Sequence, residues 1–153
     1  MDRDTLVIHD HLNRYCHAVD RGTADDVAEL FHRDGAMVPV FQGGAPIEGR
    51  DAIRAWYTEF NKVFQSDQVK YMRHRISSPI VNVDGDTATA VCYLDAEYLM
   101  VGEPAPKTIV GRYDDKLVKE GGRWTFMERQ IIGYYEYART GYTELPVQAE
   151  AAQ

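Results

Sequence analysis

The sequence predicts an α+β fold, in which three N-terminal helices and a curved antiparallel sheet enclose a pocket. Its 153 residues fit one domain. Helical periodicity ends near residue 64, and four long runs rich in Val, Ile, Thr and aromatic residues follow. Helices followed by an antiparallel meander are typical of the α+β class. We therefore expect a single domain over residues 1–145 and a flexible C-terminal tail over 146–153.

Three amphipathic segments are expected to form the helices. The first covers about residues 5–20, where apolar side chains recur at helical spacing, and Asp4 or Thr5 can cap its start. A short second helix begins at Thr23, which resembles the first residue of a capping box. The third helix, at about 51–64, has the strongest apolar stripe in the chain.

The strands are expected to build a sheet that curls. A short strand at 36–41 contains Pro39, which cannot donate to a ladder, so we expect it at the sheet edge. The long strands are expected at 69–83, 86–101, 107–119 and 123–137. A long antiparallel sheet twists and curls. Three short helices then cover its concave face only in part, and the uncovered part is an apolar cavity.

The charge and the cysteines narrow the class of protein. The net charge of −7 argues against a nucleic-acid partner, because nucleic-acid-binding domains usually carry a basic face. The two cysteines are far apart in the sequence, so they form neither a disulfide framework nor a zinc motif. No apolar stretch approaches 18 residues, and the first residues do not resemble a signal peptide. We expect no membrane partner and a cytoplasmic location.

Several short motifs carry a resemblance to a known family. They lie at 13–22, 30–35, 47–53, 73–76, 83–88 and 111–113. Together they resemble the SnoaL-like family of the nuclear transport factor 2-like superfamily, over roughly residues 5–135. The resemblance implies the cone-shaped fold of that superfamily and is nearest to its scytalone dehydratase-like and bile-acid dehydratase-like branch. One fold hosts many chemistries, so the motifs specify the fold better than the reaction.

The resemblance also implies a catalytic set. Dehydratases and a dehydrochlorinase of this superfamily share an Asp at the end of the first helix and a His at the start of a long strand, and Asp20 and His74 match them. Tyr15 matches a polar residue that precedes the Asp. A His–carboxylate pair moves protons near neutral pH, and a Tyr can donate to a carbonyl or a leaving hydroxyl. This implies a lyase that needs no cofactor and no metal, and that performs β-elimination on a hydrophobic cyclic or aromatic small molecule, as in aromatic compound catabolism.

Each of these residues also has a structural reading. Asp20 could simply end a helix, His74 could be a solvated strand residue, and Tyr15 could be part of the core. The same cavity could instead serve an isomerase or a hydrolase. It could also belong to a non-catalytic module that binds a ligand or assembles with other subunits. A binding module would have no need to pair the carboxylate with the imidazole.

Four further residues are predicted to bind substrate. Glu128 and Gln130 share a face with the aromatic residues before them in the last strand, if that strand alternates regularly. Arg112 is an inward candidate by the resemblance, where it would bind a carboxylate or phenolate, or pair with Glu128. Trp56 belongs to the apolar stripe of the third helix.

Other titratable side chains are expected at the surface. His9 and His11 are two residues apart on a helix and point to nearly opposite faces, so we expect solvated side chains and no metal site. His32 is expected to be exposed as well. Asp114 and Asp115 are expected to be charges on a strand face and not a catalytic carboxylate pair.

The sheet face away from the helices predicts self-association. One face is covered by helices, while the other still carries apolar and aromatic residues. Such a face favours contact with a second copy of the chain. We therefore expect a homodimer or a higher homo-oligomer.

Overall fold

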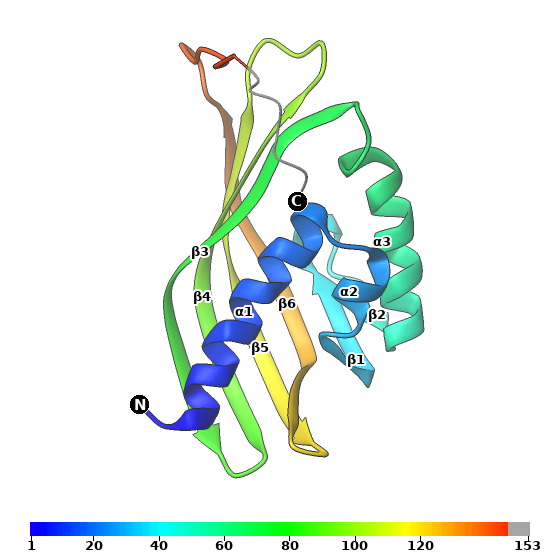
Figure 1. Cartoon of the computed structure of the whole chain (residues 1–153), viewed down its shortest axis with the longest axis vertical. Coiled ribbons are helices and arrows are strands. Elements are labelled where there is room, and N and C mark those ends of the chain that lie inside the picture. The colour runs from blue at the N-terminus through cyan, green and yellow to red at the C-terminus, as the bar shows by residue number, and fades with distance from the viewer. Residues whose placement is uncertain (147–153) are drawn as a thin grey trace.

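The computed structural model describes residues 1–146, and its elements follow the predicted order (Figure 1). The helices are α1 (Arg3–Arg21), α2 (Ala24–Ala28) and α3 (Arg50–Phe64), with a 3-10 turn η1 at Val40–Gln42. The strands are β1 (Phe31–Pro39), β2 (Ile47–Glu48), β3 (Val69–Asp84), β4 (Thr87–Met100), β5 (Lys107–Glu120) and β6 (Arg123–Ala138). Nearly all of the predicted tail, residues 147–153, lies outside the described residues.

One six-stranded sheet contains all the strands, in the order β2-β1-β6-β5-β4-β3. The four long strands pair antiparallel, which confirms the predicted α+β fold, and β1 joins β6 in parallel. The prediction that β1 forms the sheet edge was wrong, because the two-residue strand β2 occupies that edge. Pro39 is compatible with an interior strand because it is the last residue of β1.

Helix α1 lies across one face of the sheet, which we call the inner face (Figure 1). Its apolar stripe belongs to the same core as alternate residues of β4, which are buried while the residues between them are exposed over most of that strand. Ile8 and Leu12 are fully buried there, and Ala90 and Leu94 pack into the same core. Burying one such aliphatic side chain contributes about 1.5–3 kcal/mol, so this contact anchors the helix on the sheet.

Strand β3 bends at two bulges. Its register with β4 shifts between Lys70 and Arg73 and again between Ser77 and Ile80. Tyr71 and Ser78 sit at these points in the left-handed region, with φ of 60° and 53°. Bulges bend a strand and re-aim its side chains. The strand therefore curves from the end of α3 across the sheet (Figure 1).

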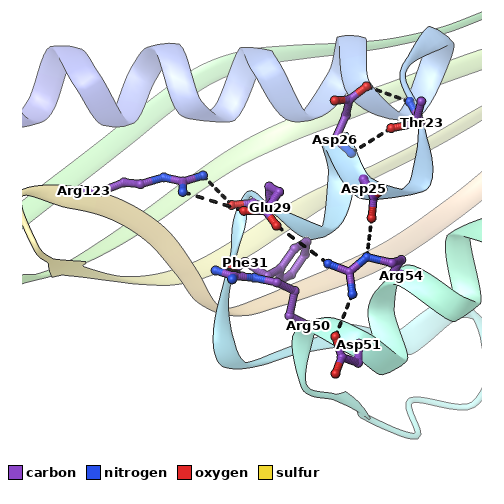
Figure 2. A network of polar contacts seen from close by, with 9 residues as sticks. All are labelled: Thr23, Asp25, Asp26, Glu29, Phe31, Arg50, Asp51, Arg54 and Arg123. Atoms are coloured by element: carbon purple, nitrogen blue, oxygen red, sulfur yellow. Dashed lines mark hydrogen bonds and ion pairs between the residues drawn. The ribbon is translucent and has the colours of Figure 1, made fainter.

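Local caps fix the starts of α1 and α2, and ion pairs tie α2 to α3. The capping box predicted at Thr23 is present, with Asp26 as its second member (Figure 2). Helix α3 is tied to α2 by Arg54, which pairs with Asp25 and lies 3.7 Å from Glu29. The start of α1 differs from the prediction, because its cap is Asp2 and neither of the two residues proposed. The capping carboxylate accepts a hydrogen bond from the backbone amide of Thr5 at 2.8 Å.

Three side chains that were predicted to be exposed are buried. His11 lies against Phe126 and is bonded through Nε2 to the Leu30 carbonyl at 3.0 Å, and burial lowers its pKa to about 4. His32 is buried against Glu120, with 2.7 Å between Nε2 and Oε2. Asp115 is also buried, in an ion pair that is described below. Each has a partner distant in the sequence, which single-sequence periodicity does not reveal.

No helix within residues 1–146 is long and apolar enough to cross a membrane.

Candidate active site

An apolar cavity of about 160 Å³ lies between the inner face of the sheet, α1 and α3. It is lined by Tyr15, Val19, Phe41, Gln42, Trp56, Tyr57, Phe60, Phe64, Met72, His74, Leu94, Ala96, Tyr98, Ile109, Tyr113, Ile131, Ile132 and Gly133. A dry cavity on the order of 150 Å³ holds one benzene ring. No Asp, Glu, Lys or Arg is among these lining residues. The cavity therefore suits one uncharged six-membered ring.

His74 and Asp20 meet at the wall of this cavity. The Asp20 carboxylate accepts two hydrogen bonds from the same residue, from the ring Nδ1 of His74 at 2.6 Å and from its backbone amide at 2.9 Å. The two side chains are 15% and 11% exposed. Because the carboxylate can only accept, Nδ1 carries a proton, and in the neutral ring Nε2 therefore keeps a lone pair. Within the described part of the chain, Nε2 has no hydrogen-bond partner, so it is free to act as a base.

Asp20 stands where a carboxylate is locally unfavourable. It is the penultimate residue of α1, and a helix C-terminus carries partial negative charge. An anion at a helix N-terminus is stabilised by roughly 0.3–1 kcal/mol, and an anion at a C-terminus is destabilised by a similar amount. The hydrogen bonds with His74 offset this cost. A carboxylate is not needed at this position to end the helix.

Two tyrosines that line this cavity are joined through their hydroxyl groups. Tyr15 and Tyr57 are hydrogen-bonded to each other, and Tyr57 donates to the sulfur of Met37 at 3.4 Å. With that donation, Tyr15 is the donor in the Tyr15–Tyr57 bond. Burial raises the pKa of Tyr15 to about 12 and raises that of Tyr57 well above its usual value. Both hydroxyls therefore keep their protons at neutral pH. Thioether sulfur is a weak acceptor, so the Tyr57 proton is the easier one to redirect to a bound oxygen.

A buried cation lies behind these tyrosine rings. The Arg129 guanidinium is fully buried and forms two parallel hydrogen bonds to Asp115, at 2.8 and 2.9 Å. Its central carbon lies 4.2 Å from the ring centre of Tyr15 and 3.8 Å from that of Tyr113. Its Nη1 has no hydrogen-bond partner among the residues described. The sequence analysis missed this pair, because its two members lie on different strands.

A bulge explains why the predicted inward residues of β6 are wrong. Lys116 lies opposite Glu128, but the next residue of β5 lies opposite Phe126, so β6 carries one extra residue. This reverses the alternation after Phe126. Arg129 therefore turns inward, while Glu128 and Gln130 bond to each other and do not line the cavity.

Arg112 also does not line the cavity. It alternates with the buried Tyr113 and lies on the face opposite α1, which we call the outer face. There it donates to both Asp114 oxygens at 2.9 and 3.2 Å and to the Tyr134 hydroxyl at 3.0 Å. The predicted roles of Arg112, Glu128 and Gln130 in substrate binding are therefore not supported by their positions.

Helix α3 supplies the aromatic wall of the cavity. Trp56, predicted to bind substrate, lines the cavity and stacks on Phe60 with 5.5 Å between ring centres. Phe60 in turn stacks on Phe64 at 4.3 Å. Stacked rings present flat faces, which complement a planar or nearly planar ring. Within residues 1–146, no group of three or more His, Cys, Asp or Glu is arranged to hold a metal ion.

The chain is similar to known proteins both in sequence pattern and in fold. The model of the SnoaL-like domain family matches residues 3–130. No protein of curated function shows significant sequence similarity to the chain. Among solved structures, a Mycobacterium tuberculosis protein of unknown function is 26% identical, with a TM-score of 0.70 over 86% of this chain and 72% of that one.

Two further solved structures share the fold at lower identity. A scytalone dehydratase-like protein of Novosphingobium aromaticivorans is 18% identical, with a TM-score of 0.74 over 98% of this chain and 95% of its own. A hexachlorocyclohexane dehydrochlorinase of Novosphingobium barchaimii is 15% identical, with a TM-score of 0.76 over 94% of this chain and 95% of its own. At these identities the likeness shows the fold alone.

Proposed function

Since the chain belongs to the SnoaL-like domain family, we propose that it is a cofactor-independent lyase that performs β-elimination on a small, uncharged ring compound. The observation that carries the proposal is the His74–Asp20 pair at 2.6 Å on the wall of an apolar cavity. A ligand-binding module has no use for an oriented imidazole with a free lone pair. The dehydratase-like and dehydrochlorinase structures that share this fold support elimination as the reaction class.

The proposed reaction is a proton abstraction coupled to loss of a leaving group. Nε2 of His74 takes a proton from a ring carbon, the C–H electrons form the new double bond, and the leaving group departs from the neighbouring carbon with its bonding pair. Asp20 holds the imidazole in this tautomer and stabilises the imidazolium that forms. A Tyr57 or Tyr15 hydroxyl donates a hydrogen bond to a substrate carbonyl or to the departing oxygen. The His74 imidazolium then gives its proton to the departing hydroxide, or to water when the leaving group is a halide, so the products are an alkene and water or an acid, and the base is restored.

The lining residues define the proposed substrate. The volume of about 160 Å³ holds one ring with small substituents. The stacked rings of Trp56 and Phe60 favour a flat apolar body. A carboxylate on the substrate would lose its hydration without gaining a cationic partner, because Arg129 lies behind the tyrosine rings and is bonded to Asp115.

We expect the enzyme to dehydrate 3-hydroxycyclohexanone, an uncharged single-ring probe, to cyclohexenone. The reaction would be followed by the near-ultraviolet absorbance of the enone and by mass spectrometry, with and without a chelator. Turnover should be the same in both, because the proposed proton transfer needs no metal.

The matched control substrate is the same ring with an added carboxylate, which should react far more slowly. Absence of elimination from any neutral β-hydroxy or β-halo ring would contradict the lyase proposal. Exchange of ring hydrogen with deuterated water without elimination would indicate an isomerase using the same dyad.

We also propose that the outer face of the sheet binds a second copy of the chain. Ile80 and Val91 are opposite one another on β3 and β4 and are 60% and 42% exposed. Tyr93 and Tyr134 lie beside Arg112 on the same face and are 54% and 47% exposed. Together they form an exposed apolar cluster on a face that also carries the Arg112–Asp114 pair, and such a cluster favours contact with a second copy.

Sedimentation equilibrium at micromolar concentration is expected to give at least twice the chain mass. Tyr93→Glu should shift the protein to monomer, because it places a carboxylate in the contact. Leu6→Glu is the control, since Leu6 is equally exposed on α1, away from the outer face. A monomeric wild-type mass would contradict self-association.

A further inference from the structure

A second, polar pocket lies where the start of β1, the start of α3 and the β5–β6 turn meet. Its volume is about 170 Å³, and none of its residues lines the apolar cavity. The lining residues are His32, Arg33, Arg50, Glu120, Arg123 and Thr125. Three arginines and one carboxylate give this lining a formal charge of +2, and just outside it the carboxylates of Asp34 and Glu29 lie 3.6 and 3.8 Å from Arg33 and Arg123. The proposed elimination does not use this concentration of positive charge.

Arg50 is held rigidly at the pocket wall. Its Nε and Nη2 both donate to the Phe31 carbonyl, at 3.0 and 2.8 Å. Nη1 has no hydrogen-bond partner in the part of the chain described here. Arg123 approaches from the start of β6 and donates to the Glu29 carbonyl at 2.8 Å, with its Nη1 3.8 Å from the Glu29 carboxylate (Figure 2). Both guanidinium groups therefore retain donor capacity.

The histidine in this pocket adds no positive charge. The backbone amide of Asp34 donates to Nδ1 of His32 at 3.1 Å, so Nδ1 is the acceptor in the neutral tautomer. Nε2 then donates to Glu120 at 2.7 Å. Glu120 also accepts from Arg33 at 3.1 Å, and these two partners hold the pKa of the Glu120 carboxyl below its usual value. Glu120 is thus a fixed anion that competes for Arg33.

A buried hydroxyl in the same wall lacks a partner. Thr125 is 5% exposed, and its Oγ1 makes no hydrogen bond to any residue in the range 1–146. A buried hydroxyl without a partner carries the full cost of its desolvation. The Oγ1 atom is closed to water in this conformation, so an oxygen acceptor held between Arg50 and Arg123 would satisfy it after a rotation of the Thr125 side chain.

We propose that this pocket binds a small oxyanion of the phosphate type, held by Arg50 and Arg123 and by the Thr125 hydroxyl. Guanidinium groups donate paired hydrogen bonds that match the oxygens of phosphate. The volume admits a phosphate or a small phosphomonoester and is too small for a nucleotide. Inorganic phosphate and a phosphomonoester present the same terminal oxygens, so the site recognises that group.

The test compares phosphate with chloride at equal ionic strength. At phosphate concentrations about ten times its Kd, the midpoint of thermal unfolding should rise by about 4 °C over chloride. Isothermal titration with inorganic phosphate and with glycerol phosphate gives the affinities of the two sources. Tighter binding of glycerol phosphate identifies an organic phosphate as the ligand, and equal or tighter binding of phosphate identifies the free ion.

Two variants with opposite expected effects make the test specific. Arg123→Gln should weaken phosphate binding by about tenfold, the lower range for one charge-assisted hydrogen bond. Glu120→Gln should strengthen binding, because it removes the competing anion from the pocket, leaves Arg33 paired with Asp34 alone among the described residues, and keeps an acceptor for His32. Arg14→Gln is the control, since Arg14 is an exposed arginine paired only with Asp10 on α1. Equal stabilisation by phosphate and chloride, or equal affinities of Arg123→Gln and Arg14→Gln, would overturn the proposal.

Discussion

Turnover is expected to fall by about 10²–10⁴-fold when His74 is replaced by Ala or Asp20 by Asn, since this is the usual contribution of general acid–base catalysis. His74→Ala removes the base itself. Asp20→Asn leaves an amide oxygen that still accepts from the His74 backbone, but its NH2 group faces Nδ1 and favours the wrong tautomer. Steady-state kinetics on the cyclic probe substrate would measure both losses, with the fold checked by circular dichroism.

Controls separate the catalytic role from a structural one. His9→Ala changes a histidine on α1 that does not line the cavity, and it should leave turnover unchanged. Tyr57→Phe should lower turnover more than Tyr15→Phe if Tyr57 is the donor to substrate, because the Tyr57 proton is bound only to a thioether. Wild-type turnover in both His74→Ala and Asp20→Asn would exclude this dyad and assign the catalysis to other residues.

The dyad was predictable because both its residues stand where sequence signals are strong. Asp20 precedes a helix end marked by Gly22, and His74 follows the first residues of a long β-rich run. Their contact was predicted only from the resemblance to a family, because the spacing of the two residues in the sequence does not by itself imply a contact. The antiparallel sheet was equally predictable from the sequence, because β4 alternates between buried and exposed residues over most of its length.

The wrong inward residues of β6 arise at a bulge, where an extra residue reverses the alternation. Regular period-two counting placed Glu128 and Gln130 in the cavity, but the bulge in β6 turned them outward and brought Arg129 inward. No glycine marks this bulge, and none marks the bends of β3 at Tyr71 and Ser78. These positions are set by how the sheet curves around α1, which depends on contacts distant in the sequence.

Breaking the buried Arg129–Asp115 pair should cause a large loss of stability. Asp115→Asn is expected to lower the free energy of unfolding by about 3–5 kcal/mol, because it leaves a guanidinium without a counter-ion in a site closed to water. Both side chains are fully buried, and one guanidinium nitrogen already lacks a hydrogen bond. Urea unfolding, followed by tryptophan fluorescence, would measure this loss of stability. The midpoint temperature of thermal unfolding should fall by about 10 °C.

The double variant decides whether the charge or the packing causes this loss. Replacing both partners, as Asp115→Leu with Arg129→Met, removes the buried charges together, so most of the stability should return. Asp10→Asn is the control, because Asp10 pairs with Arg14 at an exposed site and should change stability by no more than about 0.5 kcal/mol. A double variant as unstable as Asp115→Asn would show that the guanidinium is needed for its contacts with the rings of Tyr15 and Tyr113. Arg129 would then be a positioning residue for the tyrosines of the active site, and Tyr15→Phe would lose less turnover in the double variant than in the wild type.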